Sequence, residues 1–141
     1  MEQDRQWART HPNAFMDYNH IRITETARDR AVCELELVQE SLNPYGYAHG
    51  GAILTIIDDA AGSAAHTDGR AYVTQNSAVN FLGNQTAGTL RGEAVVRHRG
   101  RSTCLVEVTV TGEGGRTVAS GFVTYFCVDQ TVRPEREASP S

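Results

Sequence analysis

The sequence predicts a single α+β domain in which one long central helix is wrapped by a curved antiparallel sheet. Residues 51–65 are rich in Ala, Ile and Leu and lack the alternation of apolar and polar residues that is typical of strands. The segments on both sides of them do alternate. A helix that is apolar on nearly every side must be covered, so we expect the strands to curve round it.

Before the helix, the pattern predicts a short helix at residues 2–10 and strands at residues 21–27 and 31–38. The two strands alternate on either side of a turn at Asp29-Arg30, which indicates a hairpin. The loop 39–49 that follows contains an Asn-Pro pair and a glycine, which are strong turn residues.

After the helix, the chain alternates almost to its end, with breaks at glycines. The predicted strands cover residues 72–82, 89–99, 102–112 and 116–127. The plan is a hairpin, a central helix and a four-strand meander. We expect one domain at residues 21–128, an N-terminal segment at residues 1–20, and a polar, disordered tail at residues 129–141.

Composition excludes several classes of protein. The formal net charge is −4 and no basic tract or zinc-ligand spacing occurs, which argues against nucleic acid as a partner. No apolar run reaches the roughly 18–20 residues of a membrane span. Cys33, Cys104 and Cys127 are odd in number and scattered, so neither a disulfide framework nor a metal site is indicated. We expect them to pack as small apolar residues in a reducing, cytoplasmic environment.

The start of the helix carries the clearest chemistry. Gly50 and Gly51 expose backbone N–H groups at the positive end of the helix dipole, where a developing oxyanion is stabilised. Asn43, across the preceding turn, can add a side-chain N–H to the same oxygen. The alternative interpretation is that these residues form only a turn and a tight start to the helix.

Two adjacent carboxylates lie in the middle of this apolar helix, where burial is costly unless they are paired or used. Asp58 follows Gly51 by almost two turns and so lies on nearly the same face, whereas Asp59 is rotated by about 100°. We expect one to face a site and the other to point elsewhere, and spacing favours Asp58. Either could instead be a structural carboxylate bonded to backbone or arginine.

The length of the helix constrains the chemistry. From Gly50 to Asp58 it rises about 12 Å, whereas a general base must lie within about 3 Å of the group that it serves, or one water away. Asp58 therefore cannot act on a carbonyl held at Gly50 of its own chain. An antiparallel helix from a second subunit brings the two together, and the uncovered helix face also predicts a homodimer.

The spacing of Asn43, His49, Gly50, Gly51 and Asp58 resembles that of hotdog-fold acyl-CoA thioesterases, in particular the PaaI-like branch. The resemblance covers about residues 20–127. It implies the hotdog fold, a dimer with paired helices and often a tetramer, an acyl-CoA substrate, and no metal or redox cofactor.

The resemblance also implies roles for individual residues. The Gly50 N–H and Asn43 would polarise the thioester carbonyl, and Asp58 of the other subunit would be the nucleophile or the base that activates water. Thr74 falls where the family often has a hydroxyl that helps to hold the water. His49 would orient the loop through its ring N–H groups. The second acid, Asp59, departs from the family's usual pattern of an acid followed by a small or hydroxyl residue.

Coenzyme A carries phosphates, so the resemblance implies cations near the mouth of the site. The densest basic cluster lies in residues 97–102, and guanidinium groups suit phosphate oxygens. Strand residues after the helix would line the pantetheine and acyl channel. The residues expected to contact substrate are therefore Gly51, Asn76, Val79, Phe81, Arg99, Gly100, Arg101 and Ser102. The alternative interpretation is that residues 97–102 form only a solvated hairpin turn and that the strand residues form only the core of the sheet.

Two other functions stay open. A hotdog hydratase or dehydratase resembles this chain in fold but uses a histidine paired with an acid, and no second histidine follows closely after Asp58. A non-catalytic acyl-CoA binding module is the other alternative, and release of free thiol by the wild type but not by Asp58→Ala would separate it from an enzyme. Aryl and medium-chain acyl groups both fit an apolar channel.

Overall fold

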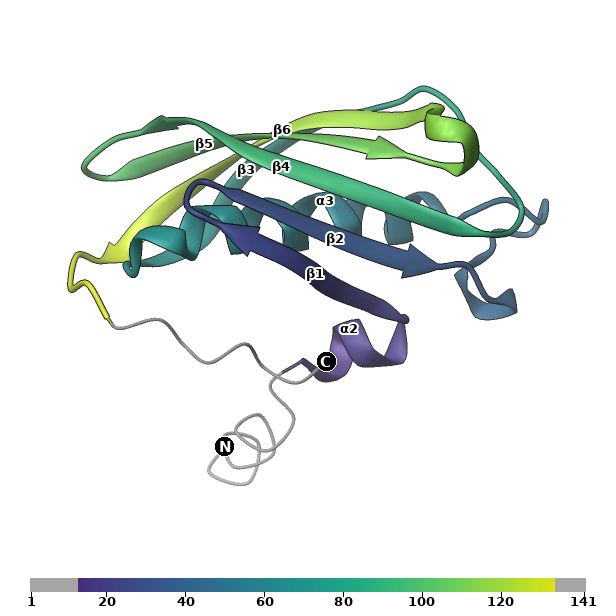
Figure 1. Ribbon diagram of the computed structural model, residues 1–141, viewed down its shortest axis with the longest axis horizontal. Coiled ribbons are helices and arrows are strands. Elements are labelled where there is room, and N and C mark those ends of the chain that lie inside the picture. The colour runs from purple at the N-terminus through teal and green to yellow at the C-terminus, as the bar shows by residue number, and fades with distance from the viewer. Residues whose placement is uncertain (1–12, 134–141) are drawn as a thin grey trace.

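The computed structural model describes residues 13–133 (Figure 1). The predicted helix at residues 2–10 lies outside this range, as does most of the predicted tail. The helical elements are α2 (Ala14–Tyr18), η1 (Gln39–Ser41), α3 (Gly50–Ala65), η2 (His66–Asp68) and η3 (Glu113–Gly115). The strands are β1 (Ile21–Ala27), β2 (Arg30–Glu36), β3 (Ala71–Phe81), β4 (Thr89–Arg99), β5 (Thr103–Thr111) and β6 (Thr117–Asp129).

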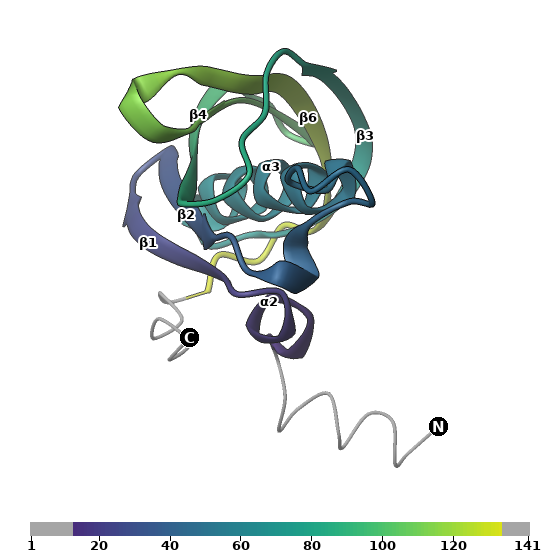
Figure 2. The same ribbon diagram turned by 90° about the vertical axis from the view of Figure 1, so that its right-hand side faces the viewer.

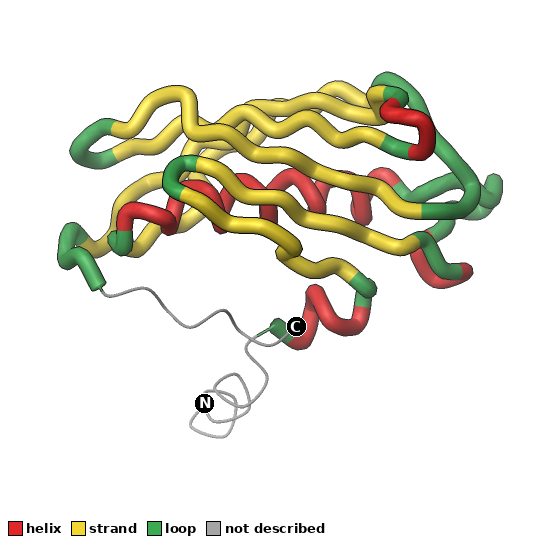
Figure 3. Tube along the Cα trace, in the orientation of Figure 1, coloured by secondary structure: helices red, strands yellow, loops and turns green. Residues whose placement is uncertain are grey.

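The strands form one antiparallel sheet that curls round α3. Its order is β1-β2-β4-β5-β6-β3. Viewed along α3, the sheet encloses the helix like a trough (Figure 2), and the helix runs lengthwise beneath the strands (Figure 3). The predicted fold class is confirmed: a single long helix of 16 residues is packed against a curved antiparallel sheet.

The strand order differs from a four-strand meander. Only β4, β5 and β6 follow one another, whereas β3 pairs with β6 at one edge of the sheet and β4 pairs with β2. After α3 and η2 the chain forms β3 at the edge of the sheet opposite β1, and it then returns to form β4 beside β2. This topology places β3 beside the side of α3 that the other strands leave uncovered.

The core lies between α3 and the concave face of the sheet. Ile53, Ile56 and Ile57 are at most 1% exposed, and the helix ends in a run of buried alanines. Burying one isoleucine side chain contributes about 1.5–3 kcal/mol. The opposite face of α3 is more open and carries Leu54, which is 40% exposed, and the half-buried Asp58. Within residues 13–133, the helix is therefore covered on its sheet side only.

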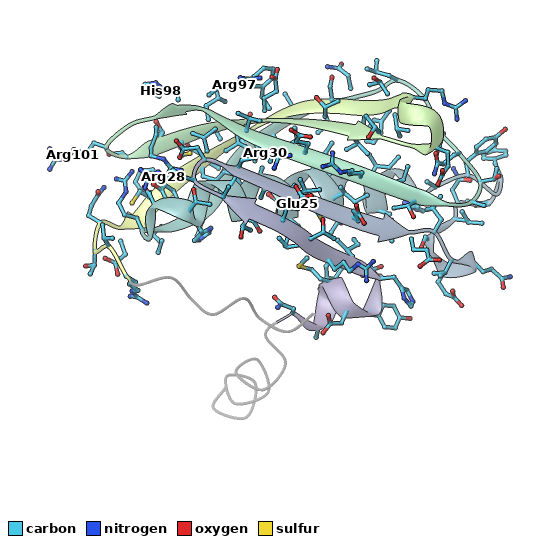
Figure 4. All side chains as sticks on the ribbon, in the orientation of Figure 1. Glu25, Arg28, Arg30, Arg97, His98 and Arg101 are labelled. Carbon is cyan, nitrogen blue, oxygen red and sulfur yellow. The ribbon has the colours of Figure 1, made fainter. Side chains whose placement is uncertain are left out.

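The outer face of the sheet carries interlocked ion pairs. Arg30 bonds to Glu25 and Glu93, and Arg97 bonds to Glu107. Figure 4 shows these arginines on the surface of β2 and β4. The paired charges indicate a solvated face. None of the helices within the described range is long and apolar enough to cross a membrane.

The end of the fold lies later than the predicted boundary. β6 continues to Asp129, and the Arg133 N–H donates to the carbonyl of Gly69 at 2.9 Å. Gln130 also donates to the carbonyl of Arg101. Residues 129–133, which the sequence assigned to a disordered tail, are thus bonded to the domain.

Candidate active site

Asn43 organises the turn that precedes α3. Its Oδ1 accepts hydrogen bonds from the N–H groups of Tyr45 at 2.9 Å and Tyr47 at 3.1 Å. Gly46 has a φ of 82°, which a side chain would oppose, so the glycine permits this tight turn. Because Oδ1 is occupied, the amide orientation is set and Nδ2 donates to no residue in the range 13–133. The N–H groups of the Asn43 side chain are therefore available as donors.

His49 caps the start of α3. Its Nδ1 accepts a hydrogen bond from the Gly51 N–H at 2.9 Å, and its carbonyl accepts from Ala52. The ring therefore acts as an acceptor toward the helix, where the sequence predicted that it would orient the loop by donating. Gly51 has its N–H occupied by this cap. The N–H of Gly50 makes no hydrogen bond with the described residues, so it is the open donor at this helix start.

Three hydrogen bonds tie this helix start to the loop between β3 and β4 and to η1. The Ala48 N–H donates to the carbonyl of Gln85 at 3.0 Å, and Asn84 Nδ2 donates to the Ala48 carbonyl at 3.1 Å. The His49 N–H donates to the carbonyl of Ser41 at 2.8 Å. Gln85 is itself buried and bonded through its side chain. The open N–H of Gly50 is thus held on a rigid support, as an oxyanion donor requires.

One carboxylate oxygen of Asp58 accepts hydrogen bonds from two hydroxyl groups. Thr74 Oγ1 donates to Asp58 Oδ1 at 2.9 Å, and Tyr125 Oη approaches the same Oδ1 at 2.7 Å. Tyr125 Oη also lies 2.7 Å from the Asp58 carbonyl oxygen. Asp58 Oδ2 accepts no hydrogen bond from the described residues. One oxygen therefore orients the carboxylate while the other stays open on the uncovered face of the helix.

Tyr125 was not predicted from the sequence. It lies on the inward side of β6 and is 3% exposed, and burial together with Asp58 raises the pKa of its phenol. It therefore remains a protonated donor. Gly62 makes room for it, because a Cβ there would lie 3.3 Å from the Tyr125 hydroxyl. A buried tyrosine needs a hydrogen-bond partner. The position of Tyr125 among the inward apolar residues of its strand is the signal that could have identified it.

A bulge in β3 decides which of its residues face the helix. Thr74 pairs with Tyr125, but Asn76 pairs with Thr124, so Gln75 is an extra residue. Before the bulge Thr74 faces inward, and after it Val79 and Phe81 do. Val79 packs against the core, and Phe81 lies 3.8 Å from the position of a Cβ on Gly50.

Asn76 was predicted to line the channel beside Val79 and Phe81, and this prediction is wrong. It is in register with Thr124, which lies between the buried Val123 and Tyr125 and so faces outward. Asn76 therefore lies on the outer face of the sheet. The prediction rested on the family resemblance, and the bulge at Gln75 decides which residues of β3 face the helix.

Asp59 points away from Asp58, as expected for neighbours on a helix. It interacts electrostatically with the buried Cys33 of β2. Its Oδ2 is closed off from solvent and has no hydrogen-bond partner within residues 13–133. Burial, and then the charge of Asp58, raise the pKa of Asp59 to about 6.

Arg99 has a structural role, which departs from its predicted contact with CoA. Its guanidinium donates to the carbonyls of Ala64 and Ala65 at the end of α3 and to Asp29, and it pairs with Asp68 at 2.8 Å. The side chain is 14% exposed. A cation at a helix C-terminus compensates the negative end of the dipole. These bonds leave the guanidinium committed to the fold.

Arg101 lies at the tip of the β4–β5 hairpin, with its side chain pointing outward (Figure 4). Gly100 and Ser102 complete the turn, and Arg70 fastens it by donating to the carbonyls of Gly100 and Arg101. Because the neighbouring Arg99 binds the last turn of α3, this tip and Gly50 lie at opposite ends of the helix. Arg101 is thus remote from the open N–H of its own chain.

The two groups of candidate site residues are separated within one chain. Gly50 and Asp58 lie about 12 Å apart along α3 by the rise of the helix. Thr74 and Tyr125 serve Asp58, whereas Asn43 lies beside Gly50. The described residues contain no group of three or more histidines, cysteines or carboxylates placed to hold a metal ion.

The chain matches the thioesterase superfamily over residues 45–119, which is more than half of its length. Acyl-coenzyme A thioesterase PaaI of Escherichia coli is 31% identical over 90 residues, covering 63% of this chain and 64% of that protein. The solved structure of PaaI superposes with a TM-score of 0.82 over 93% of this chain and 96% of PaaI, at 25% identity.

Two further relatives agree with this match. The 1,4-dihydroxy-2-naphthoyl-CoA hydrolase of Listeria monocytogenes is 30% identical over 97 residues, covering 66% of this chain and 78% of that enzyme. A hypothetical thioesterase of Streptococcus pneumoniae, solved with coenzyme A, is 31% identical with a TM-score of 0.75 and covers 80% of this chain and 92% of that one. The fold and these similarities show that the chain belongs to the thioesterase superfamily and has the hotdog fold.

Proposed function

We propose that this protein hydrolyses acyl-CoA thioesters at two equivalent sites, each shared between the α3 helices of a homodimer. The observation that carries the proposal is the carboxylate of Asp58. Thr74 and Tyr125 hold one of its oxygens, and the other is open on the uncovered face of the helix. The open N–H of Gly50 lies two turns away, so an antiparallel partner helix would align the two groups.

The relatives support an acyl-CoA substrate. PaaI and the Listeria enzyme are named for acyl-CoA chemistry, and the Streptococcus pneumoniae protein was solved with coenzyme A. Two more structures of that protein carry an Asp→Ala or a Thr→Ala substitution, 16 positions apart like Asp58 and Thr74. An aryl or medium-chain acyl group suits the apolar side chains of Val79 and Phe81. Arg101, remote from Gly50 in its own chain, would bind phosphate oxygens at the partner's site.

Hydrolysis follows from these positions in three steps. Asp58 Oδ2 takes a proton from water while the water oxygen forms a bond to the thioester carbon. The Gly50 N–H and Asn43 Nδ2 of the other subunit donate to the oxyanion, and one such donor contributes about 3–4 kcal/mol in the transition state. The carbon–sulfur bond then breaks, and the thiolate takes the proton from Asp58. The products are a free acid and CoA.

Direct attack by Asp58 on the thioester carbon is the other route: the carbon–sulfur bond breaks as the CoA thiolate leaves, and water then opens the mixed anhydride at the Asp58 carbonyl. A single turnover in water labelled with oxygen-18 separates the two. We expect the label in the released acid and none in Asp58. Label in the Asp58 carboxylate would exclude the water route.

The shared site is tested by mixing two inactive variants. Asp58→Asn removes the base, and Gly50→Pro removes the open N–H at the first helical position, which tolerates proline. In a dimer of one chain of each kind, one site receives both defects and the other receives none. Unfolding and refolding an equal mixture should therefore restore about a quarter of the wild-type activity.

Two outcomes would contradict the proposal. A mixture no more active than its components would show that each site is built within one chain. A wild type that binds acyl-CoA but never releases free thiol would favour a non-catalytic binding module. Gly50→Ala, which retains the N–H, serves as the matched control because a Cβ there finds its nearest neighbour at 3.8 Å.

A hydratase or dehydratase is not favoured by the described site. Such enzymes pair a histidine with an acid at the reacting carbon, whereas His49 accepts the Gly51 N–H and caps the helix. Asp58 is paired with the hydroxyl groups of Thr74 and Tyr125 instead.

A further inference from the structure

Asp59 is a second carboxyl beside Asp58, but the two are bonded very differently. Asp58 Oδ1 receives the hydroxyl groups of Thr74 and Tyr125. Asp59 Oδ2 is closed off from solvent and accepts no hydrogen bond from any residue in the range 13–133. Adjacent carboxyls in such unlike surroundings are typical of pairs in which each has its own role.

The groups that face Asp59 leave it without a compensating charge. Asp59 is influenced electrostatically by Asp58 of its own helix, by the buried Cys33 of β2 and by the phenol of Tyr125 on β6. All three are acidic groups, so none offers Asp59 a positive charge, and the carboxylate of Asp58 adds a negative one. Burial and this charge raise the pKa of Asp59 to about 6, so the carboxyl changes its charge close to neutral pH.

We propose that Asp59 is a positioning residue for catalysis, whose negative charge makes Asp58 a stronger base toward the attacking water. The proposal rests on the proposed thioesterase function. Interaction between two titrating groups is reciprocal: Asp58 favours the proton on Asp59, so an ionised Asp59 favours the proton on Asp58 by the same free energy. Asp58 then removes a proton from water more readily.

The orientation of Asp59 supports an indirect role. Its side chain is rotated by about 100° from that of Asp58 round the helix axis. It lies toward Cys33 and not toward the open face that carries Asp58 Oδ2. Asp59 therefore acts on the reaction through Asp58 and does not touch the substrate.

The electrostatic coupling between Asp58 and Asp59 can be measured without turnover, by carbon-13 NMR of labelled aspartate carboxyl groups in the full chain. In the wild type, the Asp58 resonance should shift in a step centred near pH 6, when Asp59 ionises. The step should vanish in Asp59→Asn and remain in Asp59→Glu. Glu36→Gln, which removes an exposed carboxylate of β2, is the matched control and should leave it unchanged.

The effect on catalysis is measured as kcat/KM for an acyl-CoA over the same pH range. In the wild type the rate should rise about threefold as Asp59 ionises near pH 6, because general-base catalysis follows the strength of the base. Asp59→Asn should keep the lower rate throughout, and Asp59→Glu should recover the rise.

The outcomes separate this proposal from the proposed function. An Asp58 resonance without the step, or a step that persists in Asp59→Asn, overturns the coupling. A normal step with a flat pH–rate profile overturns the catalytic role of Asp59 and leaves the thioesterase function intact. Absence of turnover at every pH overturns the proposed function itself.

Discussion

Tyr125 binds Asp58 twice, with its hydroxyl oxygen 2.7 Å from both the Asp58 Oδ1 and the Asp58 carbonyl oxygen. The contact joins the last strand of the sheet to the middle of the central helix. It fixes the helix backbone and the carboxylate with one buried phenol, and Thr74 supports the same carboxylate from β3. The edge strand β3 and its neighbour β6 thereby set the direction of the carboxylate that we propose as the base.

Tyr125→Phe should lower both stability and activity. The substitution removes the hydroxyl that lies against the Asp58 Oδ1 and the Asp58 carbonyl oxygen. We expect this loss to cost about 1–2 kcal/mol of the free energy of unfolding and to lower kcat about tenfold. Urea denaturation and steady-state kinetics measure the two effects. The matched variant Thr74→Val should lower kcat with a smaller loss of stability, because Thr74 is exposed. Unchanged kcat in both variants would contradict an orienting role.

Gly50→Pro should abolish most catalysis and leave the fold intact. Proline suits the first helical position, and the extended ψ of 134° at His49 is the conformation that precedes proline. Loss of one oxyanion donor lowers kcat about 100- to 1,000-fold. Gly50→Ala retains the donor and should lose far less. Equal losses in the two variants would indicate a steric cause instead.

Asp59→Asn should stabilise the protein, and more so at high pH. The pKa of Asp59 is raised from 3.8 to about 6 on folding, so the folded state holds an extra proton between these values and stability falls as pH rises through them. Above about pH 6 the full cost, at most about 3 kcal/mol, applies to the wild type and not to the variant.

Urea denaturation at about pH 4.5 and about pH 8, at one protein concentration, measures this effect. The stabilisation by Asp59→Asn should be clearly larger at the higher pH. An equal gain at both values would show that the ionisation of Asp59 carries no cost in the folded protein.

Arg99 and Arg101 should differ in what their loss affects. Arg99→Gln removes a partially buried cation from Asp29, Asp68 and the end of α3, and we expect a loss of about 3 kcal/mol in the free energy of unfolding. Arg101→Ala should leave the melting temperature unchanged and raise KM for acyl-CoA several-fold. A stable Arg99→Gln with weakened CoA binding would restore Arg99 as a ligand.

Much of the proposed site could be predicted because it is local in the sequence. Asn43, His49, Gly50 and Asp58 lie within one turn and one helix, whose regular rise sets the distance between donor and base. The same rise predicts that two chains must share a site. Thr74 was predicted from the family resemblance, and the structure places its hydroxyl on Asp58.

What the sequence by itself determined is the fold class, the bounds of the helix and most strands, and the spacing of the groups along α3, because these depend on neighbours in the chain. Tertiary structure decided the order of the strands, the outward turn of Asn76 at the β3 bulge, the commitment of Arg99 to the helix end, and the pairing of Tyr125 with Asp58 across 67 residues. The physical reason is register: one extra residue in a strand reverses which side chains face the helix, and contacts between distant segments form only once the register is set.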